Sequence, residues 1–287
     1  MTIQKNHKAK KSLELKNKFI FARAKKALGQ NFLKSTLALH KIIEVGNLSK
    51  TDTVLEIGPG KGALTEQILA CDCRVIAIEK DRELVEFLQN KFQKEITDKK
   101  LILVEDDCLN FKPKSYQLKP KTYKLIANIP YNITGAILKK FLTMSEEEGG
   151  QPERMVLMVQ HEVAKRIVAS DKKESILSIS VKAYGEPKMI MKVPARYFSP
   201  PPKVDSAVIS IKNISRNRFT STTSPLGHSS LLKEGRFWEI VKTGFAHKRK
   251  QLAGNLKGVV KDEVLKNFEK KRAEDLSLED WIHISTS

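Results

Sequence analysis

Cysteine is scarce in this sequence, and long apolar runs are absent. The three cysteines (Cys71, Cys73 and Cys108) are an odd number without a second pair at zinc-ligand spacing, so we expect reduced thiols. No apolar run approaches the ~18 residues of a membrane span, and no apolar segment of a signal peptide opens the chain. His161-Glu162 lacks a second histidine one turn later, which excludes a zincin motif. These absences predict a cytoplasmic protein with no metal site and no membrane partner.

Acidic residues are outnumbered throughout the chain. Lys and Arg number 52 against 33 Asp and Glu, giving a formal net charge of +19. Residues 1–26 alone hold nine basic residues and one acid, Glu14, with few large apolar side chains, which predicts a flexible basic arm. A lysine-rich arm can serve solubility alone, but an excess this one-signed favours nucleic acid as partner. An anionic membrane is disfavoured because the arm has little apolar face to insert.

A glycine-rich turn follows the first predicted buried strand, residues 54–57. The turn reads Gly-Pro-Gly-Lys-Gly over residues 58–62, and a second predicted strand, 75–78, ends in Glu79. This is the nucleotide-binding βαβ arrangement, in which the glycines allow close backbone approach and the acid holds ribose hydroxyls. The spacing differs from that of dinucleotide sites, and Glu56 before the glycines would repel a pyrophosphate. The charge of Glu56 therefore favours a cationic ligand such as S-adenosylmethionine.

A second strand end carries the tetrapeptide Asn128-Ile129-Pro130-Tyr131, after the apolar run 125–127. Proline stiffens the turn and removes one backbone donor, so an amide and a phenol are presented together. If the Asn128 side-chain oxygen and the Ile129 carbonyl accept the N–H groups of an adenine amine, the nitrogen lone pair can face an incoming methyl group. Tyr131 can stack on the base. An ordinary βα turn with a buried tyrosine is the alternative. Thr134 is the predicted N-cap of the next helix.

The remaining pattern predicts alternating helices and strands. We expect Leu28–Leu33 to be a lid over a ligand or a cap on the core, and Phe198, before three prolines, to be core packing or a second base-stacking platform. Predicted elements are helices at 36–45, 82–92, from 160, at 237–245, up to 268 and around 281; strands at 101–104, 155–159, 176–181 and 204–211; and a linker at 213–230 containing Arg216 and Arg218, with a basic segment at 247–250 as a phosphate contact.

Eight segments together resemble the KsgA-type small-subunit ribosomal RNA adenine dimethyltransferases. They are LGQNFL (28–33), VLEIGPGKGALT (54–65), VIAIEKD (75–81), DDCL (106–109), NIPYNIT (128–134), MVQHEVAKRI (158–167), FSPPPKVDSAV (198–208) and FAHKRKQL (245–252). The segments occur in family order over nearly the whole chain.

The resemblance implies an α/β fold, with a Rossmann-like, seven-stranded class I methyltransferase domain at 27–212 and a linker with a small helical RNA-binding domain at 213–287. It implies two methyl groups on each of two adjacent adenines in a hairpin loop near the 3′ end of small-subunit rRNA, in small-subunit biogenesis. The implied S-adenosylmethionine contacts are Asn31, Leu33, Gly58, Glu79, Asp107 and Asn128. The implied target-adenine site consists of Asn128, Pro130, Tyr131 and Phe198, with Tyr131 and Phe198 bracketing the base.

Two departures and two rival functions accompany this resemblance. Residues 171–175 read DKKES where the family usually has a Tyr-Gly or similar pair, and Cys108 replaces a small residue such as alanine. One rival is a large-subunit rRNA adenine methyltransferase of the Erm type, and the other is a non-catalytic RNA-binding relative. The segments at 28–30 and 245–250 favour the small-subunit family, and the intact 128–131 segment favours catalysis. We expect a monomer.

Overall fold

The computed structural model describes residues 24–25, 28–220, 230–247 and 249–287. Nearly all of the predicted arm at 1–26, the centre of the predicted linker and Lys248 of the basic segment lie outside the described residues. No helix in the described part of the chain is long and apolar enough to cross a membrane. Within the same ranges, no three His, Cys, Asp or Glu side chains gather in a metal-binding cluster.

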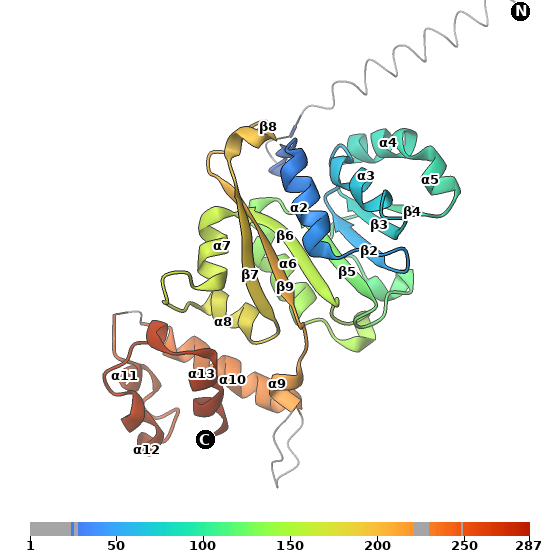
Figure 1. Cartoon of the computed structure of the whole chain (residues 1–287). Coiled ribbons are helices and arrows are strands. Elements are labelled where there is room, and N and C mark those ends of the chain that lie inside the picture. Colours follow the sequence, from blue (N-terminus) through green and yellow to red (C-terminus); the bar gives the residue numbers. More distant parts are fainter. Residues whose placement is uncertain (1–23, 26–27, 221–229, 248) are drawn as a thin grey trace, which may run out of the picture.

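A seven-stranded sheet lies at the centre of the described residues (Figure 1). Its strands, in spatial order, are β4 (Leu101–Glu105), β3 (Arg74–Glu79), β2 (Thr53–Ile57), β5 (Tyr123–Asn128), β6 (Arg154–Gln160), β9 (Ser206–Lys212) and β7 (Glu186–Val193). The first five are parallel, and β9 runs antiparallel to both of its neighbours. A separate antiparallel pair joins β1 (Phe32–Leu33) to β8 (Phe198–Ser199). The Rossmann-like, seven-stranded prediction is confirmed.

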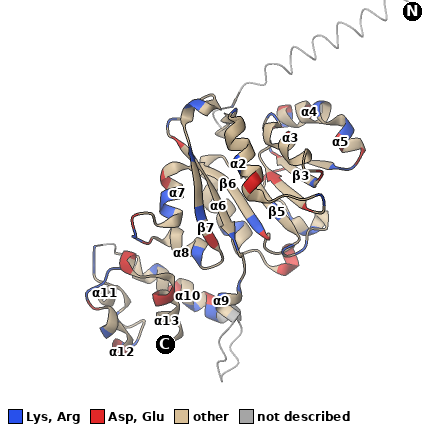
Figure 2. Ribbon diagram, viewed as in Figure 1, with Lys and Arg blue, Asp and Glu red and all other residues tan. Residues whose placement is uncertain are grey.

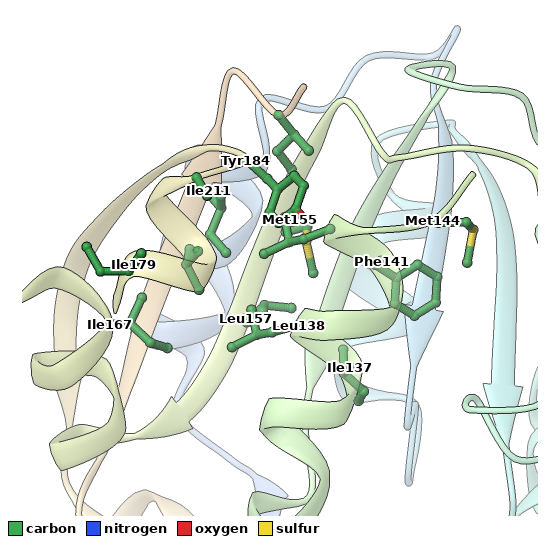
Figure 3. Close-up of a cluster of buried hydrophobic side chains, with 14 of the residues drawn as sticks. Ile137, Leu138, Phe141, Met144, Met155, Leu157, Ile167, Ile179, Tyr184 and Ile211 are labelled. Atoms are coloured by element: carbon green, nitrogen blue, oxygen red, sulfur yellow. The ribbon is translucent and has the colours of Figure 1, made fainter. Parts of the chain in front are cut away.

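Helices cover both faces of the sheet, because successive strand residues point to opposite faces and both sets are apolar. One face packs against α2 (Thr36–Gly46), α3 (Ala63–Leu69) and α4 (Arg82–Lys91), which α5 (Gln93–Thr97) follows. The other face packs against α6 (Thr134–Leu142), α7 (His161–Val168) and α8 (Ile176–Lys182). Figure 3 shows this second layer, where Leu138 of α6 lies beside Leu157 of β6. Because β4, β3, β2, β5 and β6 are parallel, their carboxyl ends lie together at one edge of the sheet. The loops at this edge form the candidate site.

Two sequence predictions of secondary structure are wrong. The run 176–181 is helix α8, not a strand, because Ser175 caps it and forms a reciprocal capping box with Ser178. The strand lies one element later, at β7. Thr134 is the first residue of α6 and not its N-cap, and its hydroxyl donates to the Tyr131 carbonyl at 3.2 Å. The other predicted helices and strands are found within a few residues of their expected places.

Five helices of the described residues follow the sheet towards the C-terminus. They are α9 (Asn217–Thr220), α10 (Ser230–Gly244), α11 (Leu252–Leu256), α12 (Asp262–Leu265) and α13 (Leu278–Thr286). Short 3₁₀ turns occur at Pro113–Tyr116, Tyr131–Ile133, Glu146–Glu148, Ala195–Tyr197, Lys266–Phe268 and Ala273–Asp275. Trp281 of α13 is fully buried. Figure 1 shows these helices beside α8, at the end of the sheet away from β8. The division at residue 212 stays a prediction.

Tyr184 joins these helices to the sheet. Its ring stacks on Trp238 at a centroid distance of 6.2 Å and tilts against Phe219 at 5.6 Å. Its hydroxyl donates to Glu234 and accepts from the Trp238 indole at 3.1 Å. The segment predicted as a linker thus includes helix α9, whose Phe219 packs against Tyr184.

The departure at 171–175 also contacts the C-terminal helices. The Glu174 backbone donates to the Glu274 carbonyl at 2.8 Å, and the Lys173 ammonium pairs with Glu274 at 3.5 Å and with Asp275. This loop therefore bridges the two parts of the chain.

Candidate active site at the carboxyl edge of the sheet

A cavity of about 180 Å³ lies where β2, β3, β4 and β5 end. Five of the residues predicted to contact S-adenosylmethionine line it: Asn31, Gly58, Glu79, Asp107 and Asn128. Pro130 and Tyr131 of the predicted target site line it as well. Loops that follow four different strands, together with the segment before β1, therefore bring these side chains together.

Glu79 is held by three backbone amides. One of its oxygens accepts from Gly60 at 3.2 Å, and the other accepts from Lys80 at 2.9 Å and Asp81 at 3.0 Å. Burial raises the pKa of this carboxyl, and the hydrogen bonds from the three backbone amides oppose the rise. The side chain is thus fixed by the glycine turn and by its own strand end, at the wall of the cavity.

Asp107 forms a second acidic position in the same wall. Its carboxylate accepts from the Leu109 backbone at 2.9 Å and from the Lys80 ammonium at 2.9 Å. The Leu109 amide first, and Lys80 next, lower the pKa of this carboxyl. Asp107 is consequently ionised at neutral pH and can accept a hydrogen bond from a ligand amine.

Glu56 does not support the electrostatic argument made from the sequence. Its side chain is fully buried, does not line the cavity, and has no well-formed hydrogen bond among the described residues. Burial raises its pKa to about 8, and the neighbouring Thr65 hydroxyl opposes the rise only in part. The carboxyl is therefore mostly neutral at pH 7 and neither attracts a cation nor repels a phosphate.

Asn128 fastens the segment before β1 to the end of β5. Its side-chain nitrogen donates to the Asn31 carbonyl at 3.1 Å, which leaves the side-chain oxygen directed away from that carbonyl. In the described part of the chain, neither this oxygen nor the Ile129 carbonyl has a hydrogen-bond partner. The two acceptors expected from the sequence are thus available at one strand end.

Tyr131 stands in the cavity wall with its hydroxyl fixed. The hydroxyl lies 2.6 Å from Ser206 Oγ, at the start of β9. Burial raises the pKa of Tyr131, and the Ser206 contact opposes that rise. The phenol therefore remains protonated at neutral pH, and a half-buried ring is held at the rim by an antiparallel strand.

Phe198 and Leu33 lie elsewhere. Phe198 is 2% exposed, packs in the core on the α2 face and does not line the cavity. Leu33, its partner in the β1–β8 pair, lines a neighbouring, more open cavity of about 870 Å³. The two cavities share Phe32, Gly58, Gly60 and Asn128. The structure thus places Phe198 in the core, one of the two roles considered for it.

Two residues that hold cavity-lining side chains in place escaped sequence reasoning. Ser206 is far from Tyr131 in sequence, and no local pattern links them. Asp81 caps α4, accepting from the Glu83 backbone at 3.1 Å, and also binds the segment before β1. An acidic residue directly before a helix is a recognisable N-cap signal, but its second contact depends on the fold.

Comparison with known sequences finds a matching family model and similar proteins. The family model described as ribosomal RNA adenine dimethylase matches residues 21–287. A protein of Dehalococcoides mccartyi strain CBDB1, named Ribosomal RNA small subunit methyltransferase A, is 40% identical over 268 residues, which cover 90% of this chain and 86% of that protein. The protein of the same name from Thermosynechococcus vestitus is 37% identical over 274 residues, 92% of this chain and 96% of that protein.

Solved structures agree on the fold. A dimethyladenosine transferase from Plasmodium falciparum superposes with a TM-score of 0.70 at 25% identity, covering 88% of this chain and 95% of that one. The 23S rRNA methyltransferase ErmE gives a TM-score of 0.69 at 23% identity, covering 89% of this chain and 98% of that one.

Proposed function

This chain belongs to the ribosomal RNA adenine dimethylase family, and we propose that it methylates N6 of two adjacent adenines in a hairpin loop near the 3′ end of small-subunit rRNA. It is an S-adenosylmethionine-dependent rRNA adenine dimethyltransferase. Relatives with 36–40% identity are named for the small subunit, whereas the likeness to ErmE supports the fold alone. The large-subunit alternative is therefore not favoured.

The residues of the site suit S-adenosylmethionine. Carboxylates at Glu79 and Asp107 match the hydroxyls and the amine of an adenosine. Gly58 lies on the shared boundary of the two cavities with φ +68°, a left-handed backbone conformation that glycine adopts without strain. Ligand pockets usually measure about 300–1,000 Å³, more than the smaller cavity alone provides. We therefore place the donor across both cavities, with Asn31 and Leu33 towards its amino-acid end.

The donor supplies an electrophilic methyl group on a sulfonium. The protein then has to present the adenine nitrogen correctly, because its lone pair is delocalised into the ring. The Asn128 side-chain oxygen and the Ile129 carbonyl would accept the two N–H bonds and stabilise the positive charge that develops on nitrogen. Pro130 keeps the two acceptors rigidly placed, and Tyr131 would stack on the base. Phe198 would join the bracket only if the β1–β8 pair shifts when RNA binds.

The pair of free acceptors at Asn128 and Ile129 carries this proposal. The test is to incubate the protein with immature small and large ribosomal subunits and labelled donor, then to map N6,N6-dimethyladenosine along each rRNA. We expect two adjacent modified adenines in small-subunit rRNA. Modification of large-subunit rRNA would favour the Erm-type alternative, and donor binding without methyl incorporation would favour a non-catalytic relative.

The rest of the chain would hold the RNA during small-subunit assembly in the cytoplasm. We assign that role to residues 213–287, acting in a monomer, and to the basic arm at 1–26. Figure 2 shows Lys and Arg positions on the C-terminal helices interspersed with acidic ones. Exposed Arg249, Lys250 and Lys257 are the cations we expect to contact phosphates.

A further inference from the structure

The segment from Leu28 to Asn31, here called the roof, forms part of the wall of the donor cavity. It is fastened at two places. At its end, the Asn31 carbonyl accepts from Asn128, as described above. One residue earlier, the Gln30 side-chain amide donates to Asp81 Oδ2 at 2.8 Å. The roof is therefore held by one contact with Asn128, at the end of β5, and one with Asp81, which lies outside the cavity.

Asp81 uses both carboxylate oxygens to hold this second point. Its side chain is 2% exposed, and Oδ1 accepts from the Lys25 ammonium at 2.7 Å. Gln30 closes the arrangement, because its side-chain oxygen accepts from the Lys25 backbone at 2.8 Å. We call Lys25, Gln30 and Asp81 the clasp. Hydrogen bonds to an ionised, shielded carboxylate are stronger than neutral ones, so the clasp is a substantial restraint on the roof.

The clasp is also linked to the ribose-binding position. The Asp81 backbone donates to Glu79 at 3.0 Å, so one short turn orients the Glu79 carboxylate with its main chain and the roof with its side chain. Gly29 has φ +64° and lies against Pro130 and Asn132. A Cβ added to Gly29 would stand 3.6 Å from Pro130 Cβ and 3.6 Å from Asn132 Oδ1. The roof thus joins the donor side of the cavity to the target side.

We propose that Asp81 is a positioning residue that holds the roof over the bound donor and so sets the rate at which S-adenosylmethionine and its product S-adenosylhomocysteine leave. This inference rests on the proposed function. Opening the clasp would free the roof to move away from a ligand beneath it, and Asp81 is the member of the clasp that belongs to the rigid sheet edge. Its loss would accelerate exchange without removing a group that touches the reacting atoms.

Asp81→Asn is the sharpest variant. Asparagine caps helices as well as aspartate does, so α4 keeps its N-cap, while the ion pair with Lys25 is lost and one acceptor becomes a donor facing the Gln30 amide. We expect the Kd for S-adenosylhomocysteine, measured by calorimetry, to rise about fivefold to tenfold through faster dissociation. The KM for the donor should rise in parallel, with kcat at saturating donor changed less than about twofold.

Two further variants complete the test. Glu83→Gln is the matched control, because Glu83 pairs with Lys25 at 3.2 Å, is exposed and does not contact Gln30; donor and product affinities should stay unchanged. Gln30→Leu opens the clasp from the other side and serves if the Asp81 variant fails to fold. Combined with Asp81→Asn, this change should add little, because both substitutions break the same hydrogen bond between Gln30 and Asp81.

Hydrogen exchange over residues 28–33 supplies a readout that a general loss of stability would not give. Bound S-adenosylhomocysteine should slow exchange there in the parent protein and much less in Asp81→Asn. Product affinity within twofold of the parent, or a fall in kcat at unchanged KM, would overturn the role of Asp81. Failure of the parent protein to bind either donor or product would instead contradict the proposed function, so the two failures are distinguishable.

Discussion

Two regions of the molecule are built from different kinds of contact. One is the carboxyl edge of the sheet with Glu79 and Asp107, where we propose that the methyl donor binds, here called the donor edge. The other is the junction of the sheet with the C-terminal helices, where Tyr184 contacts Glu234 and Trp238. At the donor edge, carboxylates accept from backbone amides close in sequence, as Glu79 does from Lys80 and Asp107 does from Leu109. At the junction, the side chain of Tyr184 meets that of Glu234, far apart in sequence, beside a backbone hydrogen bond from Glu174 to the Glu274 carbonyl. Backbone contacts fix a position whatever the neighbouring side chains are, whereas the contacts of Tyr184 depend on particular partners. Glu79 and Asp107 should therefore tolerate changes in neighbouring side chains better than Tyr184 does.

The largest effect should come from breaking the donor edge at Asn128. Asn128→Ala removes one of the two acceptors proposed for the adenine amine, and losing one such preorganised group typically costs about 10²–10³-fold in kcat. RNA affinity, measured by filter binding, should stay within about twofold, because the junction and the helices beyond it are untouched. Turnover comparable with that of the parent protein would contradict the role of Asn128.

A second, smaller effect should follow from the opposite end of the molecule. Changing Arg249, Lys250 and Lys257 to Gln should reduce the magnitude of the negative slope of log K against log salt for RNA binding by about two to three units, because each phosphate contact contributes about 0.7–0.9. Donor affinity should not change. Lys94→Gln with Lys99→Gln, two exposed residues near the β4 edge, is the matched control, and an equal loss there would argue against a specific surface. Neutralising the basic arm at 1–26 should act in the same direction.

Tyr184→Phe tests the junction itself. It removes one hydroxyl that bonds both Glu234 and Trp238 while keeping the stacked ring. The half-buried Trp238 indole then loses its acceptor and Glu234 is left with its ion pair with Arg216 at 3.8 Å, so the free energy of unfolding should fall by about 1–3 kcal/mol. Urea titration measures this change. Donor affinity, determined in the same preparation without denaturant, should be unaltered, since a fall would show that the two regions are energetically coupled.

The last prediction concerns how the free energy of unfolding varies with pH through Glu56, which lies in the sheet beneath the glycine turn. The folded pKa of Glu56, about 8, lies above that of an unfolded glutamate, so the folded state binds the extra proton between these values. Its contribution to stability is complete below about pH 4 and declines as pH rises towards 8. Glu56→Gln is neutral throughout, so its melting temperature relative to the parent should increase from pH 5.5 to 8.5. A constant difference would contradict the raised pKa.

The same contrast explains what the sequence could predict. The glycine turn, the acid at the end of β3 and the Asn128 tetrapeptide are local patterns, and seven of the nine predicted site residues line the cavity. That these residues bind the donor and the adenine stays a prediction. The strand at 176–181 was mispredicted because a capping box outweighed the β-branched composition. The junction was not predictable, because Tyr184 acquires its partners only when distant segments pack together. The burial of Glu56 and Phe198 likewise depends on which helix covers each face.

The antiparallel strand β9 sets the distance between its contact with Tyr131 and the start of the C-terminal helices. Ser206 at its start contacts Tyr131, and Lys212 at its end leads into the C-terminal helices, so these two points are separated by one strand of roughly 20 Å. A strand bonded on both sides does not stretch. If Tyr131 and the helices beyond Lys212 both contact the RNA, as proposed above, the two contacted parts of the RNA must lie about that far apart.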